Sequence, residues 1–333
     1  DCDSLTTVTF LPNSQLEQID GSAFARSGGL TTFTIPASVT TIGGDIFKAT
    51  GSLQEIIFEH ETIPAAGIHA NAFRGVPDTC VIKHGEILYN TVNEFFNSLR
   101  FTYEGFQYKF NSDNTATLVG HDGSTNPAKM VPSFIEGGVT YTVVFEGGHF
   151  SGNNTLQSVE ILTGVSQIVN SMFSQCNSLQ SVTINASNVS IGDRAFYSCS
   201  NLLDLSFDNV DSIASYAFNY CGIQHADLSN VSVINANAFR VSSLQSITFS
   251  SKQNTIPNNV CDNCGNLRSV TIPSNVTTIN QNAFTTCRLL ETVTILSPSD
   301  LTHIHYQAFY QSGIRTINIP DTITYMDPTA ILR

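Results

Sequence analysis

The chain has 333 residues, of which 41% are hydrophobic and 12% are charged. This apolar content argues against a disordered chain, and no run approaches the ~18 consecutive apolar residues of a membrane-spanning helix. With 27 acidic and 14 basic residues the formal net charge is -13, which repels phosphate backbones and argues against nucleic acid as a partner.

A short motif repeats from the beginning of the chain. It reads L-x-x-V-x-I, then a turn often marked by Pro, then V-x-x-I-x-x-x-A-F-x-x-C. A fixed period of about 20 to 29 residues is typical of units that stack, because one unit cannot bury its apolar face alone. The first copies begin at Leu5, Leu30 and Leu53, and they predict an N-terminal array.

The period fails after the third copy. Residues 77–99 begin like a strand and continue with apolar residues at helical spacing, namely Leu88, Val92, Phe95, Phe96 and Leu99. We expect an amphipathic helix that caps the open end of the first array. Alternating aromatic residues then predict a hairpin over residues 103–126, with a polar turn at residues 111–114. Residues 130–155 hold a degenerate copy, which predicts the start of a second array.

Clear copies of the motif fill the rest of the chain. They begin at Leu156, Leu179, Leu202, Ile223, Leu244, Leu267, Leu290 and Ile314. Most carry an Ala-Phe or similar pair farther on, but the copy at Leu244 carries Asn259-Val260 in that place. The regular spacing predicts one strand for each copy.

The copy at residues 179–184 indicates how one unit folds. Val182 and Ile184 are expected to face inward and Ser181 and Thr183 outward, because side chains alternate along a strand. Strands stacked about 4.8 Å apart then pair in parallel around an apolar spine. The sequence predicts a mostly-β solenoid in two arrays. Residues 1–100 form the first array with its helical cap, and residues 101–333 form the hairpin lead-in and the second array.

The motif resembles the BspA-like leucine-rich repeat, a class found in many bacterial and some protist surface proteins. The clearest copies are residues 267–287 and 30–47, and residues 105–141 resemble the lead-in of that family. The resemblance implies an α/β-type solenoid, a right-handed leucine-rich-repeat superhelix. It also implies export, display at or outside the cell surface, and binding of host or matrix molecules, with no catalytic motif to transfer.

Outward strand positions form the exposed face of a solenoid, and here most of them are hydroxyls. The exceptions are Glu160, Asp204, His225 and Asp227. In-register stacking predicts Asp204 and His225 about 5 Å apart, close enough for a hydrogen bond and a raised histidine pKa. We expect either an acidic patch that contacts a cationic group or divalent ion, or a solvated ion pair on a polar sheet.

The cysteines and the other histidines have both structural and chemical interpretations. Cys176, Cys199, Cys221, Cys264 and Cys287 recur at one position of the motif, which favours buried free thiols. Cys261-x-x-Cys264 could bind a metal or form a disulfide, and His303-x-His305 could bind a metal. Both metal sites are disfavoured, because no further ligand stands at suitable spacing. We therefore expect no cofactor and no metal.

The sequence contains no phosphate-binding loop, nucleophile elbow or H-E-x-x-H. We expect a non-enzymatic, secreted or cell-surface module that recognises an extracellular or host protein on its polar face. The alternative is a glycan-binding module, because tyrosines gather near the Ala-Phe turns. These are Tyr197, Tyr216, Tyr220, Tyr306 and Tyr310. An enzyme would have to use Asp204, His225 and Asp227.

Overall fold

The computed structural model is a mostly-β parallel solenoid of about 12 turns. It describes residues 4–61, 63–64, 67–69, 72–99, 101–110, 115–121, 127–136 and 139–332. The chain divides into two compact units. The first contains Asp1–Tyr103, Gln107–Val119 and Ser133–Val144. The second contains Glu104–Phe106, Gly120–Pro132 and Phe145–Arg333. The repeats fold as the alternation predicts: Val182 and Ile184 are buried, and Thr183 between them is exposed.

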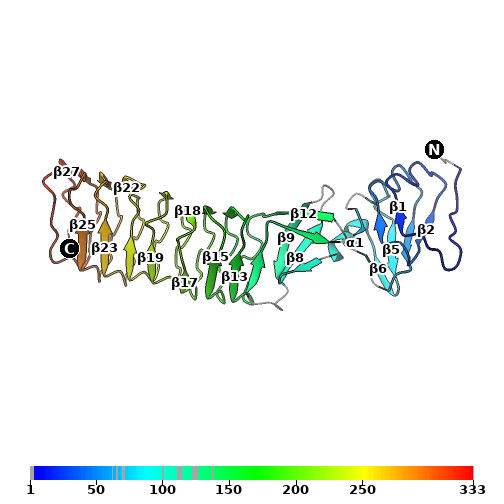
Figure 1. Cartoon of the computed structure of the whole chain (residues 1–333), viewed down its shortest axis with the longest axis horizontal. Helices are drawn as coiled ribbons and strands as arrows, with labels where there is room; N and C mark the ends of the chain where they lie inside the picture. Colours follow the sequence, from blue (N-terminus) through cyan, green and yellow to red (C-terminus); the bar gives the residue numbers. More distant parts are fainter. Residues whose placement is uncertain are drawn as a thin grey trace. The chain divides into compact units, whose positions relative to one another are not determined.

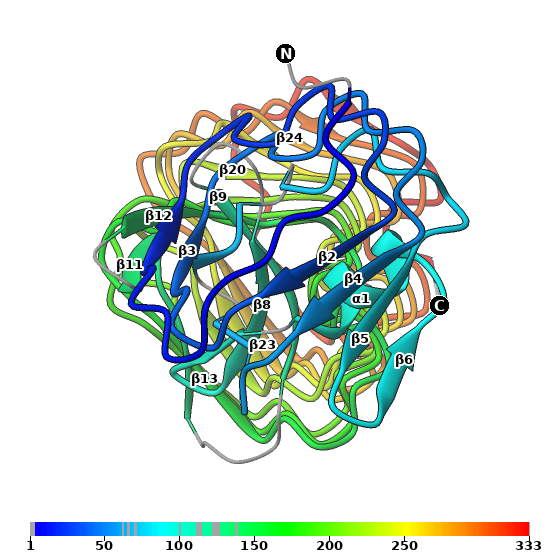
Figure 2. The ribbon, with the colours of Figure 1, turned by 90° about the vertical axis from the view of Figure 1, so that its right-hand side faces the viewer.

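The first unit contains parallel strands from the copies at Leu30 and Leu53 and from residues 81–84, whereas the opening segment of the copy at Leu5 forms no strand. A four-stranded sheet contains β2 (Thr32–Ile35), β4 (Glu55–Phe58), β5 (Val81–His84) and β6 (Ile87–Tyr89) (Figure 2). The first three strands pair in parallel, and β6 is antiparallel to β5. A shorter pair, β1 (Gln18–Ile19) and β3 (Thr41–Ile42), is also parallel. Phenylalanine rings fill the core between these strands.

The helix of this unit, α1 (Val92–Ser98), is shorter than the pattern predicts. It begins after Thr91, whose Oγ1 accepts a hydrogen bond from the Glu94 amide at 3.0 Å, as an N-cap does. Leu88 was expected in the helix but lies in β6, because Gly85 with φ +57° turns the chain into a hairpin first. Phe95 stacks on Phe58 with ring centroids 5.1 Å apart, so the helix covers the core as expected.

The lead-in forms a five-stranded sheet. Its strands, in order across the sheet, are β11 (Ser133–Glu136), β12 (Val139–Val144), β9 (Thr115–His121), β8 (Phe106–Phe110) and β7 (Phe101–Tyr103). The hairpin expected over residues 103–126 corresponds to β8 and β9, which are neighbours in this sheet. Its turn at residues 111–114 lies outside the described residues, as do Gly137 and Gly138.

The second unit stacks its repeats in chain order, and Figure 1 shows the long strands side by side. The first strand of each repeat lies in one of two four-stranded ladders: β10 (Ala128–Met130), β13 (Ser158–Ile161), β15 (Ser181–Ile184) and β17 (Asp204–Leu205), then β19 (His225–Asp227), β21 (Ser246–Thr248), β23 (Ser269–Ile272) and β25 (Thr292–Ile295). All these pairs are parallel. The degenerate copy thus begins the first of these ladders, through β10.

A second set of short strands follows the turn within each repeat. These strands are β14 (Gln167–Ile168), β16 (Val189–Ile191), β18 (Val210–Ile213) and β20 (Val233–Ile234), then β22 (Thr255–Ile256), β24 (Thr278–Ile279), β26 (His303–Ile304) and β27 (Tyr325–Met326). They also pair in parallel. Each repeat therefore contributes hydrogen bonds on two sides of the core.

The first-strand ladder is interrupted between β17 and β19, where continuous pairing was expected. The cause lies in the spacing from the Phe turn to the next strand. Ala195 and Leu202 are seven positions apart, but Ala217 and Ile223 are only six apart. The same shortening separates Ala308 from Ile314, and residues 314–319 form no strand, which corrects the strand expected there. Ala238 and Leu244 are also six positions apart, yet β21 pairs with β19. The two interruptions therefore share a connection that is one residue shorter than that of the preceding repeat.

The Phe turns form a column through the second unit. Phe173, Phe196, Phe218 and Phe239 stack with centroids 5.2–5.5 Å apart and ring planes within 13°. The column stops in the copy at Leu244, where the structure aligns Val260-Cys261 with Ala-Phe. The amide of Phe239 donates to the Val260 carbonyl, as that of Phe218 donates to Ala238. The expected placement of Asn259-Val260 is therefore wrong by one position.

Candidate binding surfaces

The outward side chains of β21, β23 and β25 form two rows of hydroxyls that β-pairing holds in register. Ser246, Ser269 and Thr292 are paired neighbours in one row. In the other row Thr248 pairs with Thr271, and Thr271 pairs with Thr294. We use the name sheet face for the outward positions of the first strands of the repeats, which are β13, β15, β17, β19, β21, β23 and β25. Parallel pairing places neighbouring hydroxyls about one strand spacing, ~4.8 Å, apart.

The four predicted site residues lie on the sheet face, but not as one cluster. The carboxylate of Glu160 in β13 accepts a hydrogen bond from the side-chain amide of Asn185 at 2.5 Å. His225 of β19 bonds to the Ser246 hydroxyl at 2.8 Å, while Asp227 accepts from the Ser229 amide at 3.1 Å. The Asp204 carboxylate on β17 has no polar partner among the described residues. β17 and β19 do not pair, so the in-register stacking behind the predicted approach of Asp204 and His225 is absent, and their closeness stays a prediction.

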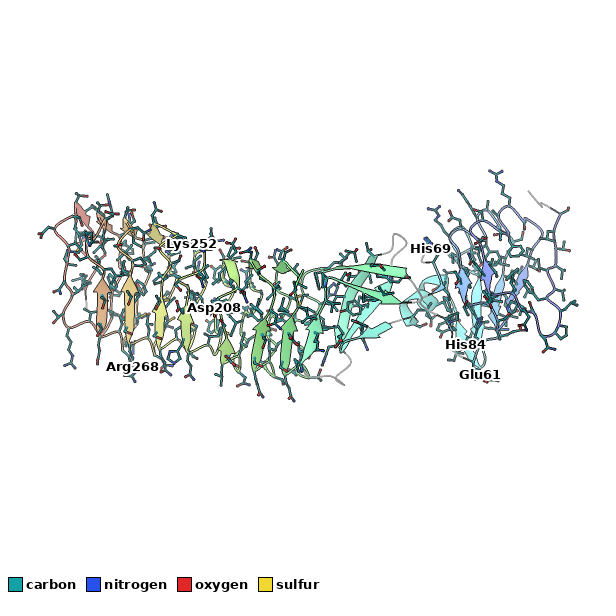
Figure 3. All side chains as sticks on the ribbon, in the orientation of Figure 1. Glu61, His69, His84, Asp208, Lys252 and Arg268 are labelled. Carbon is teal, nitrogen blue, oxygen red and sulfur yellow. The ribbon has the colours of Figure 1, made fainter. Side chains whose placement is uncertain are left out.

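The sheet face carries carboxylates without matching cations. Between β13 and β25 its positions include three acids and neither lysine nor arginine. Lys129 of β10 is the paired neighbour of Glu160, and its ammonium lies 3.0 Å from Glu104. Lys252 and Arg268 lie at opposite ends of the strands, away from the face (Figure 3). The field over the middle of the face is therefore negative.

The cysteine column is buried and free, as expected. The thiols of Cys176, Cys199, Cys264 and Cys287 also donate hydrogen bonds, each to the carbonyl at the Phe position of the preceding repeat. Cys199 donates to Phe173 at 2.9 Å and Cys264 to Phe239 at 3.0 Å. Ser27, Ser242 and Ser312 stand at the same position of other repeats. This substitution by serine was a signal for the donor role that the sequence interpretation missed.

Burial governs the chemistry of these thiols. It raises the pKa of Cys176 to about 12 and that of Cys221 to about 12, and it raises the pKa of Cys261 and Cys287 well above the ordinary value. A thiol is nucleophilic and metal-binding as its thiolate. In the Cys261-x-x-Cys264 motif burial keeps Cys261 protonated, whereas, against the effect of burial, hydrogen bonds with Cys261 and Ser242 lower the pKa of Cys264. Both cysteines are free.

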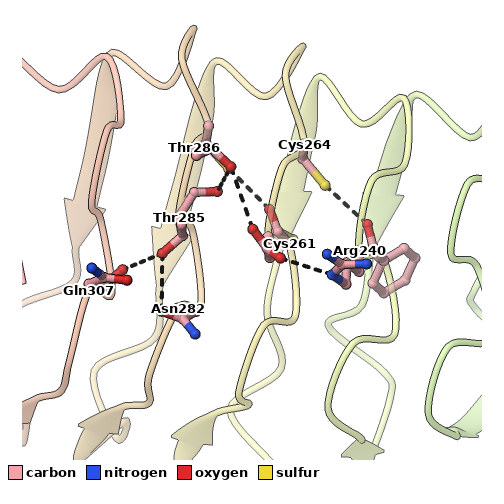
Figure 4. Close-up of polar contacts among 10 residues, drawn as sticks. Arg240, Cys261, Cys264, Asn282, Thr285, Thr286 and Gln307 are labelled. Carbon is pink, nitrogen blue, oxygen red and sulfur yellow. Dashed lines mark hydrogen bonds and ion pairs between the residues drawn. The ribbon is translucent and has the colours of Figure 1, made fainter. Parts of the chain in front are cut away.

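A separate polar network lies beside this motif (Figure 4). The Arg240 guanidinium donates to the Asp262 carboxylate at 2.9 Å, and the Thr286 hydroxyl donates to its other oxygen at 3.5 Å. The hydrogen bond to Asp262 raises the pKa of Arg240. Three successive repeats are thus joined by side chains on their turns.

The His303-x-His305 pair lies beside Tyr325. The two imidazole centroids are 6.0 Å apart, and those of His305 and Tyr325 are 5.5 Å apart. Across the part of the chain that the structure describes, no three histidine, cysteine or acidic side chains are arranged to hold a metal ion. Within the same residues no helix has the length and apolar character to cross a membrane.

The repeat geometry agrees with a family comparison. The model of the "BspA type Leucine rich repeat region (6 copies)" matches residues 1–102, 142–242 and 211–332. These segments include most of the chain, so the protein belongs to the BspA-type leucine-rich repeat family. The comparison confirms the resemblance deduced from the repeated motif. No curated protein matches the chain.

Solved structures similar to this chain are leucine-rich repeat proteins of bacteria. One from Bacteroides ovatus has a TM-score of 0.56 and 24% identity, over 68% of this chain and 60% of that one. A leucine rich cell surface protein from Faecalibacterium prausnitzii has a TM-score of 0.31 and 20% identity, over 70% of this chain and 86% of that one. The pneumococcal vaccine antigen PcpA has a TM-score of 0.38 and 16% identity, over 67% of this chain and 71% of that one. The first likeness supports the fold, and the chain spans 60% of that protein's length.

Proposed function

We propose that this protein is a non-enzymatic binding module, secreted or displayed at a cell surface, whose sheet face recognises an extracellular or host protein or matrix component. The observation that carries the proposal is the register of hydroxyls and carboxylates on that face. Backbone pairing fixes their positions before any partner arrives. A preorganised surface loses little conformational entropy on binding, so many weak contacts can add up. In this proposal the repeats form two arrays of a right-handed superhelix.

The charge of the sheet face defines the partner further. Lys129 pairs in register with Glu160, but no lysine or arginine occupies a sheet-face position next to Asp204 or Asp227. This favours a partner that presents lysine or arginine side chains to those two acids. Such complementarity increases the association rate and makes affinity fall as salt rises. Of the four residues, Asp204 is the strongest candidate for contact, because its carboxylate has no partner among the described residues.

The experiment is a pull-down of partners from host extracellular extract with the whole chain, followed by titration of each retained protein. Double substitution Asp204→Asn and Asp227→Asn is expected to weaken binding about 3–10-fold, because exposed ion pairs contribute about 0.2–1 kcal/mol each. Asp321→Asn, an exposed acid away from the sheet face, is the matched control. Unchanged affinity of the double variant would reject the sheet face as the binding surface.

Glycan binding is the second candidate function. It is favoured by a specific arrangement of tyrosines on the turns, away from the sheet face. The same chain can offer both surfaces, since they lie on different segments of each repeat. Retention of polysaccharides instead of proteins by the whole chain would favour this second function.

A further inference from the structure

Three successive Phe turns carry a compact group of tyrosines and arginines, which we name the tyrosine patch. It consists of Arg194, Tyr197, Tyr216, Tyr220 and Arg240. The Tyr197 and Tyr220 rings meet edge to face at a centroid distance of 5.9 Å. The Arg194 guanidinium lies over the Tyr216 ring at 4.9 Å, within cation–π range. Tyr220 is 46% exposed, so its ring is available to a ligand.

The patch is held rigidly by the turns beneath it. The amide of Ser198 donates to the Asn219 carbonyl at 2.7 Å, and the amide of Tyr220 donates to the Arg240 carbonyl at 3.2 Å. Below these turns the rings of Phe196, Phe218 and Phe239 stack at 5.2–5.4 Å. The tyrosines therefore need little further ordering when a ligand binds.

Charge on the patch is balanced locally. Arg194 pairs with Asp193 at 2.6 Å, and Arg240 pairs with Asp262 at 2.9 Å. Neither guanidinium is an unpaired cation, which disfavours an anionic ligand. Each arginine–carboxylate pair still presents donors and acceptors side by side, and neighbouring hydroxyls of a sugar ring need that combination. The patch thus joins aromatic faces to neutral hydrogen-bonding groups.

The size of the patch disfavours a protein partner. A stable protein interface buries about 800 Å² on each side around an apolar centre. Among residues 193–198, 215–220 and 237–241, Tyr220 alone is a large, strongly exposed hydrophobic side chain. Three tyrosine rings on two neighbouring repeats instead match a short run of sugar units, whose C–H faces pack on tyrosine while their hydroxyls reach the edges.

We propose that the tyrosine patch is a binding site for a neutral glycan chain. The sugar rings stack on Tyr197 and Tyr220, and the pairs around Arg194 and Arg240 exchange hydrogen bonds with the hydroxyls. This site is separate from the sheet face, so either proposal can fail without the other.

The test is a glycan array probed with the whole chain, with neutral gluco-, manno-, galacto- and N-acetylglucosamine oligosaccharides beside sialylated and sulfated ones. We expect retention of at least one neutral series. The double variant Tyr197→Asn and Tyr220→Asn should weaken its binding at least tenfold. Asparagine suits these positions, because Asn219 and Asn263 occupy them in other repeats, so the variant keeps a residue type that the fold already accepts.

Three controls separate stacking from other causes. Tyr306→Asn removes a tyrosine that is 48% exposed but lies outside the patch, and it should leave affinity within twofold. Tyr220→Phe keeps the ring and should retain most of the binding. The double variant Asp204→Asn and Asp227→Asn should bind glycan normally. The proposal is overturned if no neutral glycan is retained, if anionic glycans are preferred, or if the Tyr197 and Tyr220 double variant binds like the parent.

Discussion

Phe turns whose two flanking positions are both described are bracketed by two residues in the left-handed backbone region, four positions apart. The pairs include Arg194 and Ser198, Tyr216 and Tyr220, Asn237 and Val241, and Asn259 and Asn263. In the most divergent turn, glycine fills both positions, Gly148 and Gly152. The left-handed region costs a side-chain-bearing residue roughly 1–2 kcal/mol, with asparagine among the better tolerated. The backbone of these turns is therefore strained wherever the residue is not glycine or asparagine, and most of all at a β-branched residue.

Val241 is such a residue, with φ +57°. Replacing it by asparagine, the residue at the equivalent position 263, is expected to stabilise the fold by about 1 kcal/mol because the left-handed strain is relieved. The measurement is the urea midpoint of the whole chain. The reverse change at the matched position, Asn263→Val, should lower the midpoint. Equal midpoints for both variants would contradict the strain argument.

The buried thiols predict a pH dependence. Burial raises the pKa of Cys176 and Cys221 from 9.0 to about 12, so folding favours the protonated form. This stability is fully present below pH 9 and is lost as the pH rises through 12, with a slope of ~1.4 kcal/mol per pH unit for each thiol. Denaturant midpoints from pH 8 to 11 measure it.

The matched variant for this pH series is Cys221→Ser, since Ser242 occupies the equivalent position of the next repeat. A serine hydroxyl does not ionise in this range, so the variant should lose less stability between pH 9 and 11 than the parent does. Identical pH profiles would show that the Cys221 thiol does not contribute to the decline.

At the scale of the element, the connection between a Phe turn and the next strand determines whether the ladder continues. Gly222 lies in a shortened connection, and a Cβ added there would be 2.2 Å from the Ser200 carbonyl oxygen. Gly313 meets the Arg288 carbonyl in the same way, at 2.4 Å. At Gly265, the equivalent residue of a full-length connection, a Cβ meets nothing within 4 Å. A close backbone approach accompanies each interruption.

This difference gives a matched pair of substitutions. Gly222→Ala is expected to destabilise the protein by about 1–3 kcal/mol, because the new methyl group overlaps a carbonyl oxygen. Gly265→Ala should be neutral or stabilising by about 0.4–1 kcal/mol through the unfolded state. Thermal melting of both variants checks the prediction, and a larger loss at Gly265 than at Gly222 would refute it.

The repeated elements were predictable because their signal is strong. Alternation assigned the inward Val182 and outward Thr183 correctly, and the cysteine positions indicated a buried column. The exceptions have local causes that the repeat pattern hides. A one-residue shortening separated β17 from β19, a glycine hairpin placed Leu88 in a strand, and Cys261 took the place of a phenylalanine. Each depends on how one repeat meets its neighbour, which a consensus motif does not describe.

At the scale of the molecule, the interruption between β17 and β19 divides the ladder of the second unit. Across an intact junction the Gln245 amide donates to the Gln224 carbonyl at 2.7 Å. The equivalent amide of Gln224 has no such bond to β17 among the described residues. Hydrogen exchange should therefore be faster at Gln224 and Ala226 than at Gln245 and Ile247, because unpaired strand amides are less protected. Equal protection at both junctions would mean that the ladder is continuous in solution.

The fold of the whole chain followed from the repeat, but its candidate binding surfaces did so only in part. The outward residues of the sheet face were identified one by one, whereas the expected closeness of Asp204 and His225 assumed unbroken stacking. The tyrosines were noticed as a group, yet their pairing with Arg194 and Arg240 depends on side-chain geometry across three turns. The ligand of each surface remains a proposal, because a shared fold does not specify a ligand.

A stack in which each rung touches only its neighbours has a mechanical consequence. Tension applied at an end removes the outermost rung first, since inner rungs are shielded until it leaves. The repeat from Leu244 to the next at Leu267 contains 23 residues, which extend to about 80 Å at about 3.5 Å per residue. Under tension a stack of this kind is expected to lengthen in steps, and every step dissipates work.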